Sequence, residues 1–483
     1  MDIVIILNYN NCKTTRGEKS MTFGKYLEKC IKKREVSISY LTKISGVNRG
    51  KLYYVYEGKR KLTEDELFLL IEKAGFSNIE TDKLLNLYFE DVYGKTEFSR
   101  IKYLENAIQR DNYSCINCNI HSVENDIKGA IENKKQLVNS IIYMFYHDRE
   151  IISNFSYRDE EIDSVVFDCV LNSKMKLTHI MDLSVDEMSE ENLERIFASL
   201  KYMYNNCFPV YRYTNIRQME YNNIFPYYFV GESYAILYND DNGIFISDTE
   251  IVSNIRKNVN KVVDDCILLG LKTNDLMYVK SLYEKGSKQF GSSTITFTFY
   301  PCIAKYVDYD FMYSITKNEL PEKDMLVNIA FEYYSKIYQN RKFICLTTSK
   351  GLQMFSETGN IQEIYDTYVN AADKESRIKV LKNMIVGINN GDLFILDDDK
   401  INICPGMEIE NHNKKLIING YDFEKKNFTA VDKFIFSLDD QSIINTFNNF
   451  KDYIIHARKV YPKEYSIRFI EGLIVKLEHM NIE

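Results

Sequence analysis

The chain has 483 residues, more than one hydrophobic core usually organises, so we expect two to four domains. Apolar residues make up 45%, and 20 Gly and six Pro are few for such a length, which excludes a largely disordered protein. The longest apolar run, Ile3–Leu7, falls far short of the roughly 20 residues that cross a bilayer. Ten Cys without regular spacing indicate reduced thiols, and we expect a cytoplasmic protein.

Residues 1–21 are expected to be a non-structured leader. The Gly17-Glu18 codons can read as a ribosome-binding purine run just before Met21. We therefore take Met21 as a hypothetical translation start, and an intact mass that includes residues 1–20 would contradict it.

The first helices of the chain are predicted from apolar spacing and capping residues. Apolar residues from Phe23 to Ile31 recur every three or four positions, which predicts a helix that ends near Arg34. Ser37 is a good N-cap for a second, short helix, and Gly46 ends it because glycine tolerates the left-handed conformation of a tight turn. Val47 follows as an apolar plug between two helices.

A third helix is predicted to open at Asn48, another good N-cap. Leu52 and Val55 point inward in this helix. The outward residues are then Arg49, Gly50, Lys51, Tyr53 and Tyr54. Residues 57–61 form a basic turn suited to phosphate, and two further amphipathic helices follow it, with Leu67, Leu70 and Ile71 in one and Leu84, Leu85 and Leu87 in the other.

Positive charge is concentrated in this segment. Residues 22–61 hold eleven Lys or Arg against three Glu, although the whole chain carries a net charge of −8. An interaction bundle has no need of such a local excess, whereas duplex DNA rewards it through the release of counterions. The charge pattern therefore favours binding to nucleic acid over a purely structural bundle.

The segment resembles the Cro/phage-repressor (XRE) helix-turn-helix family. The resemblance lies in Leu41–Leu52, LTKISGVNRGKL, followed by Glu57–Arg60, EGKR. The resemblance covers about 75 residues of the chain. Three positions, Ile38, Thr42 and Tyr56, carry residues other than those frequent in the family. The resemblance implies base contacts at Arg49, Gly50 and Tyr54, and phosphate contacts near Ser39, Asn48, Lys51, Lys59 and Arg60.

The remaining residues predict a large α/β (α+β) body with hairpin-rich mixed sheets. Alternating elements are expected, namely helices at Phe98–Ile108, Val123–Phe145 and Glu190–Tyr204 and strands at Lys176–Leu183 and Pro209–Tyr213. Hairpin signals begin at Tyr227 and are followed by a helix capped by Ser247 or Asp248. A similar strand-turn-strand-helix unit is predicted at Phe343–Thr347, Leu352–Phe355 and a helix from about Asn360, and a strand-rich stretch from Leu393 to Phe436 precedes a helix at Asp439–Phe450.

We therefore predict four segments: a leader at 1–21, an all-α five-helix head at 22–95, an α/β domain at 96–215, and an α+β sensor or dimerisation region at 216–483. The last region holds two similar subdomains if the repeated unit is real. Aromatic residues between 200 and 310 either line a ligand pocket or belong to the core, and the core is the simpler interpretation.

The sequence offers little catalytic or metal-binding chemistry. Cys115, Cys118 and His121 lack a nearby fourth zinc ligand, and three positions along a strand would place His179 and Asp182 on opposite faces. Asp240-Asp241 and Asp397–Asp399 have turn-forming neighbours and are expected to be solvated turns. No phosphate loop, dinucleotide fingerprint or nucleophile elbow occurs, so we expect no enzyme, no cofactor and no metal.

These patterns together predict a transcriptional regulator that binds double-stranded DNA as a homodimer, like the many bacterial regulators with a small DNA-binding head on a large body. The residues expected at the DNA are Ser39, Asn48, Arg49, Gly50, Lys51, Tyr53, Tyr54, Lys59 and Arg60. The body would sense a small molecule or protein. Two alternatives remain: an enzyme or defence effector with a helix-turn-helix targeting or autoregulatory module, and a protein-interaction scaffold.

Overall fold

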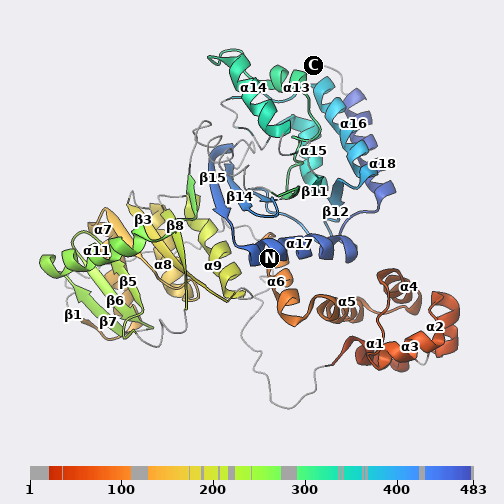
Figure 1. Ribbon diagram of the computed structural model, residues 1–483, viewed down its shortest axis with the longest axis horizontal. Coiled ribbons are helices and arrows are strands. Elements are labelled where there is room, and N and C mark those ends of the chain that lie inside the picture. Colours follow the sequence, from red (N-terminus) through yellow and green to blue (C-terminus); the bar gives the residue numbers. More distant parts are fainter. Residues whose placement is uncertain are drawn as a thin grey trace, which may run out of the picture. The chain divides into compact units, whose positions relative to one another are not determined.

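The chain forms two compact units, Met1–Phe98 and Ser99–Glu483, in a computed structural model (Figure 1). We call the described residues of the first unit the head and those of the second the body. The structure describes residues 21–34, 36–109, 129–172, 175–186, 190–204, 207–215, 223–240, 242–272, 291–335, 338, 342–361, 364, 368–423 and 430–479. The leader expected at 1–21 lies outside these residues apart from Met21.

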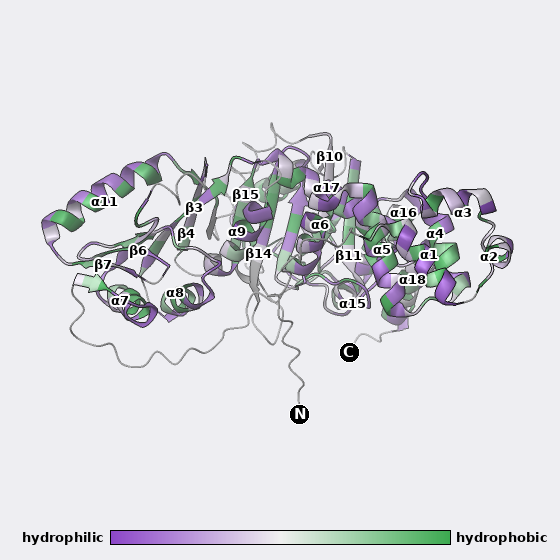
Figure 2. Cartoon of the chain, turned by 90° about the horizontal axis from the view of Figure 1, so that it is seen from below, coloured by the Kyte–Doolittle hydropathy of each residue, from purple (hydrophilic) through white to green (hydrophobic). Residues whose placement is uncertain are grey.

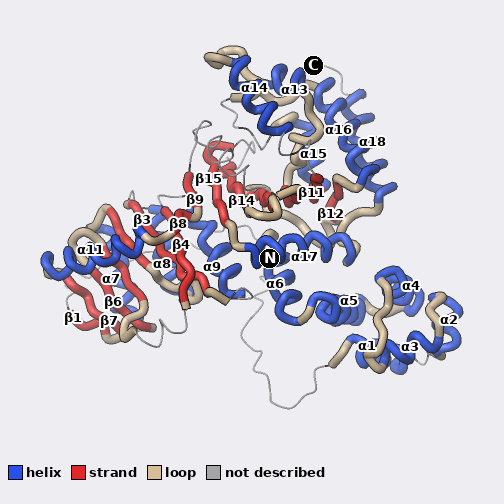
Figure 3. The backbone as a smooth tube through the Cα atoms, in the orientation of Figure 1, coloured by secondary structure: helices blue, strands red, loops and turns tan. Residues whose placement is uncertain are grey.

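The head is all helix, as predicted, with helices joined by short loops (Figure 3). Its helices are α1 (Phe23–Lys33), α2 (Ile38–Ser45), α3 (Arg49–Tyr56), α4 (Glu64–Ala74) and α5 (Asn78–Tyr93). Ser37 and Asn48 are the N-caps of α2 and α3, as predicted. Leu67, Leu70 and Leu84 are fully buried. A further helix, α6 (Lys95–Ala107), crosses the boundary between the units and lies mostly in the body.

The body is α+β with two mixed sheets, which confirms the predicted fold class. Its helices beyond α6 are α7 (Lys134–His147), α8 (Glu160–Asn172), α9 (Glu190–Leu200), α11 (Thr249–Asp264), α13 (Tyr309–Ile315), α14 (Lys323–Tyr334), α15 (Ser349–Thr358), α16 (Lys374–Asn390), α17 (Gln441–His456) and α18 (Lys463–His479). A short 3-10 helix, Lys201–Tyr204, follows α9. Within the described residues, none of these helices combines the length and apolarity needed to cross a membrane.

The first sheet has the strand order β1-β7-β6-β5-β2-β3-β4-β8. Strands β2, β3 and β4 are parallel, whereas β5 runs antiparallel to β2 and starts a meander through β6 and β7. The strands are β1 (Gly129–Ile131), β2 (Glu150–Ser153), β3 (Lys176–Ser184), β4 (Cys207–Thr214), β5 (Tyr227–Val230), β6 (Ala235–Asn239), β7 (Asn242–Ile246) and β8 (Ile267–Leu268). The sheet therefore combines strands from both sides of residues 215–216, where the sequence predicts a domain boundary.

Helices cover both faces of the first sheet. Figure 2 shows α11 on one face, with alternating hydrophobic and hydrophilic segments, and α7 and α8 on the other. The α11 side packs Val252 and Val259 against Val230 of β5. The α7–α8 side is rich in aromatic residues such as Phe229 and Tyr238, so the aromatic residues predicted as core do form a core.

The second sheet has the strand order β12-β11-β10-β13-β14-β15-β9. Its strands β10, β11 and β12 are parallel, and β13, β14 and β15 continue antiparallel from β10. The strands are β9 (Gly270–Lys272), β10 (Ser293–Thr298), β11 (Lys342–Thr348), β12 (Leu393–Leu396), β13 (Met407–Asn411), β14 (Leu416–Phe423) and β15 (Ala430–Leu438).

The two sheets repeat one topology. Each sheet has three parallel strands and a three-strand antiparallel meander. The first strand of the meander pairs antiparallel with the first of the parallel strands, and a helix follows the meander, α11 in one copy and α17 in the other. A short strand pairs with the outer meander strand of each sheet, β1 with β7 and β9 with β15. On the opposite edge, β8 pairs with β4, and Val460 bridges Leu396 at the corresponding place. The repeated unit is thus a whole sheet with its helices.

The repeat predicted from sequence is smaller and partly wrong. Residues 352–355, predicted as a strand, lie in helix α15. Among the residues that the structure describes here, the next helix is α16, which starts at Lys374 and not near Asn360. The Thr348 side chain accepts a hydrogen bond from the Gly351 amide at 2.9 Å and so starts α15 where a turn is predicted. Residues 129–131 form strand β1, so the helix predicted from Val123 is also too long.

A buried polar network distinguishes the second sheet. Glu410 accepts a hydrogen bond from Tyr338 at 2.8 Å and another from Asn419 at 2.8 Å, and its Oε2 lies 3.0 Å from His412 Nε2. The other imidazole nitrogen of His412 lies 3.0 Å from Thr294 Oγ1. These hydrogen bonds offset the cost of burying polar groups on the sheet.

Candidate nucleic-acid interface

Helices α2 and α3 form a helix-turn-helix. Ser37 caps α2 through the Tyr40 amide at 3.1 Å, and Asn48 caps α3 through the Gly50 amide at 2.8 Å. Between the helices, Gly46 has a φ of 66°, the left-handed conformation predicted for it, and Val47 is buried. The turn therefore follows from glycine's freedom at positive φ and from one apolar anchor.

The inner side of α3 is fixed by packing. Leu52 and Val55 are buried as predicted, and Tyr56 is buried beside them. A Cβ placed at Gly24 of α1 would overlap the Val55 carbonyl oxygen, so α1 and α3 approach each other as closely as glycine allows. Burial also raises the pKa of Tyr56 to about 12, and its phenol stays neutral at physiological pH.

The outer side of α3 presents four of the predicted residues together. Arg49, Gly50, Tyr53 and Tyr54 are exposed, and their spacing places them along one stripe of the helix. Tyr53 and Tyr54 are 44% and 47% exposed, which is high for large aromatic residues. The Arg49 guanidinium carbon lies 5.9 Å from the centroid of the Tyr53 ring.

The turn after α3 adds exposed basic residues to this stripe. Arg60 lies over the Tyr54 ring, with its guanidinium carbon 5.4 Å from the centroid, and the Lys59 ammonium is 2.7 Å from Glu57. Because the Lys59–Glu57 pair is largely exposed, solvent weakens it, and Lys59 can exchange Glu57 for a phosphate.

Lys51 does not face outward as predicted. Its ammonium lies 2.5 and 2.7 Å from the two carboxylate oxygens of Glu66, and both side chains are partly buried. Glu66 also completes a capping box with Thr63 at the start of α4. Lys51 therefore ties α3 to α4, and its charge is already paired inside the head.

The two remaining predicted residues lie beside the stripe. Ser39 is exposed in the first turn of α2, and its carbonyl accepts a hydrogen bond from Thr42 Oγ1 at 2.9 Å. The Asn48 side chain is engaged as the cap of α3. Ser39 thus keeps its hydroxyl on the surface, while Asn48 can add only its amide nitrogen to an interface.

Acidic residues of α4 and α5 reduce the charge of the head. Residues 62–93 hold eight Asp or Glu against two Lys, which offsets most of the excess in residues 22–61. Glu80 shows the effect, since its pKa is lowered to about 2 by the hydrogen bond from Arg34 and those from Ser77. The head as a whole is therefore nearly balanced in charge, and the exposed basic residues of α3 and of the turn after it are Arg49, Lys59, Arg60 and Lys61.

The arrangement suits contact with a polyanion that also offers flat polar edges. Arg49 can donate two parallel hydrogen bonds to a guanine edge, and Tyr53 and Tyr54 can pack on bases or sugars. Gly50 allows the helix backbone to approach closely. These are the side-chain types and the spacing that a recognition helix needs.

Comparisons with known proteins identify no family. No family model matches the chain, and no curated protein matches it. Solved structures similar to it include TrmBL2, an archaeal chromatin protein described as showing a novel mode of DNA binding, at 12% identity over 48% of this chain and 88% of that one, with a TM-score of 0.22. Another is phosphatidylserine synthase from Haemophilus influenzae Rd KW20, at 11% identity over 72% and 91%, with a TM-score of 0.23. At these TM-scores neither likeness supports a statement about fold or function.

The other candidate groups have structural roles where they are described. His179 is buried, with Nδ1 3.1 Å from Ser153 Oγ, and Asp182 accepts a hydrogen bond from Arg212 at 2.6 Å. His179 and Asp182 thus bind separate partners, as the strand spacing predicts. Asp397 pairs with Lys400 at 2.7 Å, and in the part of the chain that the structure covers no group of three potential ligands could hold a metal. Cys115, Cys118, His121 and Asp241 lie outside the described residues.

Two features of the interface were missed in the sequence. Tyr56 departs from the family pattern, yet its burial has a signal in the sequence, because a residue four positions after Leu52 falls on the same side of the helix. The pairing of Lys51 with Glu66 has no signal in the sequence, because the two residues are 15 positions apart and meet only in the folded head.

Proposed function

We propose that the chain is a cytoplasmic, sequence-specific regulator of transcription whose head is a Cro/phage-repressor type helix-turn-helix. In this proposal α3 enters the major groove, with Arg49, Gly50, Tyr53 and Tyr54 at base edges. Lys59, Arg60 and Ser39 would contact phosphates.

The observation that carries the proposal is the outer stripe of α3. Four polar or aromatic residues are exposed together on a short helix that is capped at Asn48 and held from behind by Leu52, Val55 and Gly24. Exposed tyrosines beside arginines are the residue types enriched at binding interfaces. A groove in a nucleic-acid duplex accounts for both the charge and the aromatic residues.

A homodimer is part of the proposal. One head with four base-contacting positions makes few contacts, and a two-fold pair doubles them at half-sites about one helical turn apart. The body would then set the dimer or respond to an effector.

The test is selection of bound genomic fragments by the full chain, followed by titration at several salt concentrations. We expect Arg49→Ala to weaken specific binding by about 10- to 100-fold and to relax the sequence preference at one base pair. Lys59→Ala should weaken binding to all sequences alike and reduce the salt slope by about one.

Lys73→Ala is the matched control, because it removes one exposed positive charge from α4, away from α3. It should leave the affinity within a few tenths of a kcal/mol of wild type. A salt slope near zero, or equal losses for Arg49→Ala and Lys73→Ala, would exclude the proposed interface, and binding of α3 to an acidic protein instead would favour the scaffold alternative.

A further inference from the structure

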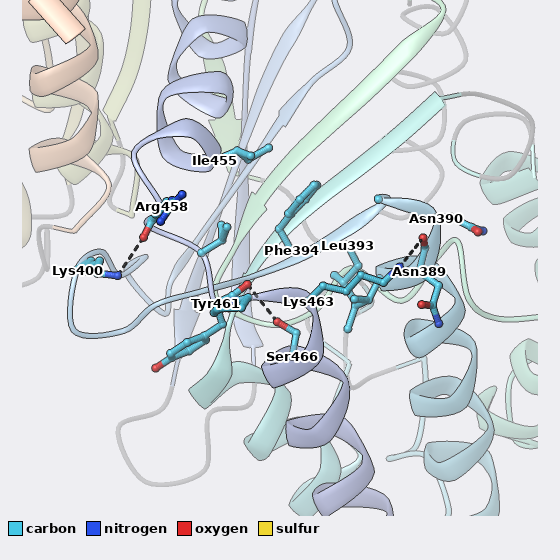
Figure 4. A pocket seen from close by; sticks show the side chains of 14 residues that line it. Asn389, Asn390, Leu393, Phe394, Lys400, Ile455, Arg458, Tyr461, Lys463 and Ser466 are labelled. Atoms are coloured by element: carbon cyan, nitrogen blue, oxygen red, sulfur yellow. Dashed lines mark hydrogen bonds between the residues drawn. The ribbon is translucent and has the colours of Figure 1, made fainter. Parts of the chain in front are cut away.

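The body contains a cavity of about 750 Å³ at one edge of the second sheet. It lies between the end of α16, strand β12 and the connection from α17 to α18 (Figure 4). Apolar side chains form much of its wall: Ile388, Leu393, Phe394, Ile455, Val460 and Pro462. Its volume is within the range of sites that hold small molecules.

The polar part of the wall is basic. Lys400, Arg458 and Lys463 line the cavity, and none of its lining residues is acidic. Lys400 is partly engaged, since its ammonium lies 2.7 Å from Asp397 and 3.0 Å from the Arg458 carbonyl oxygen. Lys463 makes one weaker contact, to the Asn389 carbonyl oxygen at 3.3 Å. Figure 4 shows these basic groups coming from separate segments around one space.

The backbone at Arg458 is unusual. Arg458 has a φ of 52°, a left-handed conformation that follows the end of α17 and normally favours glycine. Its amide bonds the Ile455 carbonyl at 3.1 Å, as in a regular helix end. Glycine would adopt this backbone conformation at lower cost, so Arg458 occupies the position against the local preference.

Helix α18 gives the cavity a third positive feature. The helix begins at Lys463, and its 17 residues direct a positive dipole end toward the lining residues Pro462 and Lys463. Among the described elements, the first sheet has no counterpart of α18, because its β8 leads directly to β9. The cavity is therefore a property of the second copy of the repeat.

We propose that this cavity binds a small amphiphilic carboxylate, with the carboxylate between Lys463 and Arg458 and the apolar portion against Phe394, Ile455 and Val460. The apolar wall selects the body of the ligand, and the two cations with the α18 terminus select its charge. The inference rests on the cavity and holds whether or not the head binds DNA. It names the chemical class of the small molecule that the body would sense in the proposed function.

The test uses the full chain and decanoate as the probe, kept below its critical micelle concentration and titrated by calorimetry. Decanol is the uncharged comparison. We expect one decanoate per chain with saturable binding, and decanol about tenfold weaker or more. Lys463→Gln should weaken decanoate binding about tenfold and leave the weak binding of decanol unchanged.

Arg458→Gly separates binding from folding. It should also weaken decanoate binding about tenfold, yet leave the melting temperature of the body unchanged or higher, because glycine relaxes the left-handed backbone. Lys476→Gln is the control, because it removes an exposed charge from α18 outside the cavity and should bind decanoate as wild type does.

Equal affinity for decanol and decanoate, binding of many molecules per chain, or an equal loss in Lys476→Gln would overturn the proposal. If Arg458→Gly lowers the melting temperature, its loss of binding could come from unfolding, and the decanoate affinity of Lys463→Gln alone then tests the proposal. Loss of DNA binding in a separate assay has no bearing on this result, so failure of the site and failure of the proposed function are distinguishable.

Discussion

At the scale of single residues, Lys51 shows what residue type alone does not reveal. A lysine on a short helix rich in Arg and Tyr is a reasonable DNA contact, and the sequence predicts it as one. Packing instead places its ammonium on Glu66, where it joins two helices. Arg49, two positions earlier, stays exposed. The difference arises from Glu66 in the first turn of α4, whose carboxylate reaches the Lys51 ammonium.

His179 gives the first sheet a dependence on pH. Burial lowers the pKa of His179 to about 3, the nearby Arg195 adds to the effect, and Nε2 has no hydrogen-bond partner among the described residues. Above the unfolded pKa of about 6.5 both states are neutral, and His179 adds no pH dependence. Below it only the unfolded chain takes up the proton, so the stability contributed by neutral His179 declines by about 1.4 kcal/mol per pH unit until the pH reaches about 3.

Unfolding in urea between pH 7.5 and 5, followed by near-ultraviolet circular dichroism, measures this slope. We expect the slope to flatten in His179→Asn, even though the variant is less stable at every pH. His147→Gln removes an exposed imidazole and should keep the wild-type slope. An unchanged slope in His179→Asn would show that another group dominates.

At the scale of elements, the contact of α1 with α3 depends on one glycine. A Cβ at Gly24 has nowhere to go except into the Val55 backbone, so Gly24→Ala must push α1 away from α3. We expect it to destabilise the head by about 1–3 kcal/mol and to weaken DNA binding in the same variant. Gly472→Ala, in α18 with open space around its Cβ, should instead stabilise the body by about 0.5–1 kcal/mol. Hydrogen exchange of peptides from α1 and α3 measures the first effect, and equal protection in Gly24→Ala and wild type would contradict it.

The helices of the head were predictable because their signals are local. Ser37, Gly46 and Asn48 each act within three residues, and the structure places all three as predicted. The strand predicted at Leu352–Phe355 is wrong because so short an apolar run does not distinguish a strand from a helix. The Thr348 cap starts a helix there instead. At the candidate interface, the exposed stripe was predictable from helical spacing. The pairing of Lys51 was not, because it depends on contacts distant in sequence.

At the scale of the whole molecule, the two sheets share a topology but not an interior. Their registers place Glu410 where the first sheet has Phe229, and Asn419 where it has Tyr238. One copy therefore fills its centre with aromatic rings and the other with a hydrogen-bonded polar network. Because the repeated positions differ in chemistry, comparison of sequence patterns could not find the repeat, whereas strand order makes it plain.

Helix α6 determines where the body begins. Ile101, Leu104 and Ile108 are fully buried, and Arg100 donates to Ser442 of α17 at 2.8 Å. Glu105 is buried; desolvation raises its pKa, but pairing with Lys102 and with Lys459, at 2.6 Å, outweighs burial and leaves the pKa below its usual value. These contacts make α6 part of the core of the body and more than a linker from the head.

A chain that starts at Lys95 should therefore fold and melt at the temperature of the body in the full-length protein. A chain that starts at residue 110 loses three buried aliphatic residues and leaves Lys459 without its buried carboxylate, which should cost about 5 kcal/mol or more. Leu104→Ala in the full chain provides a milder version, with an expected loss of about 2–5 kcal/mol. Calorimetry of the three proteins compares them directly. Similar melting temperatures for the two truncated chains would mean that α6 only connects the units and adds nothing to the stability of the body.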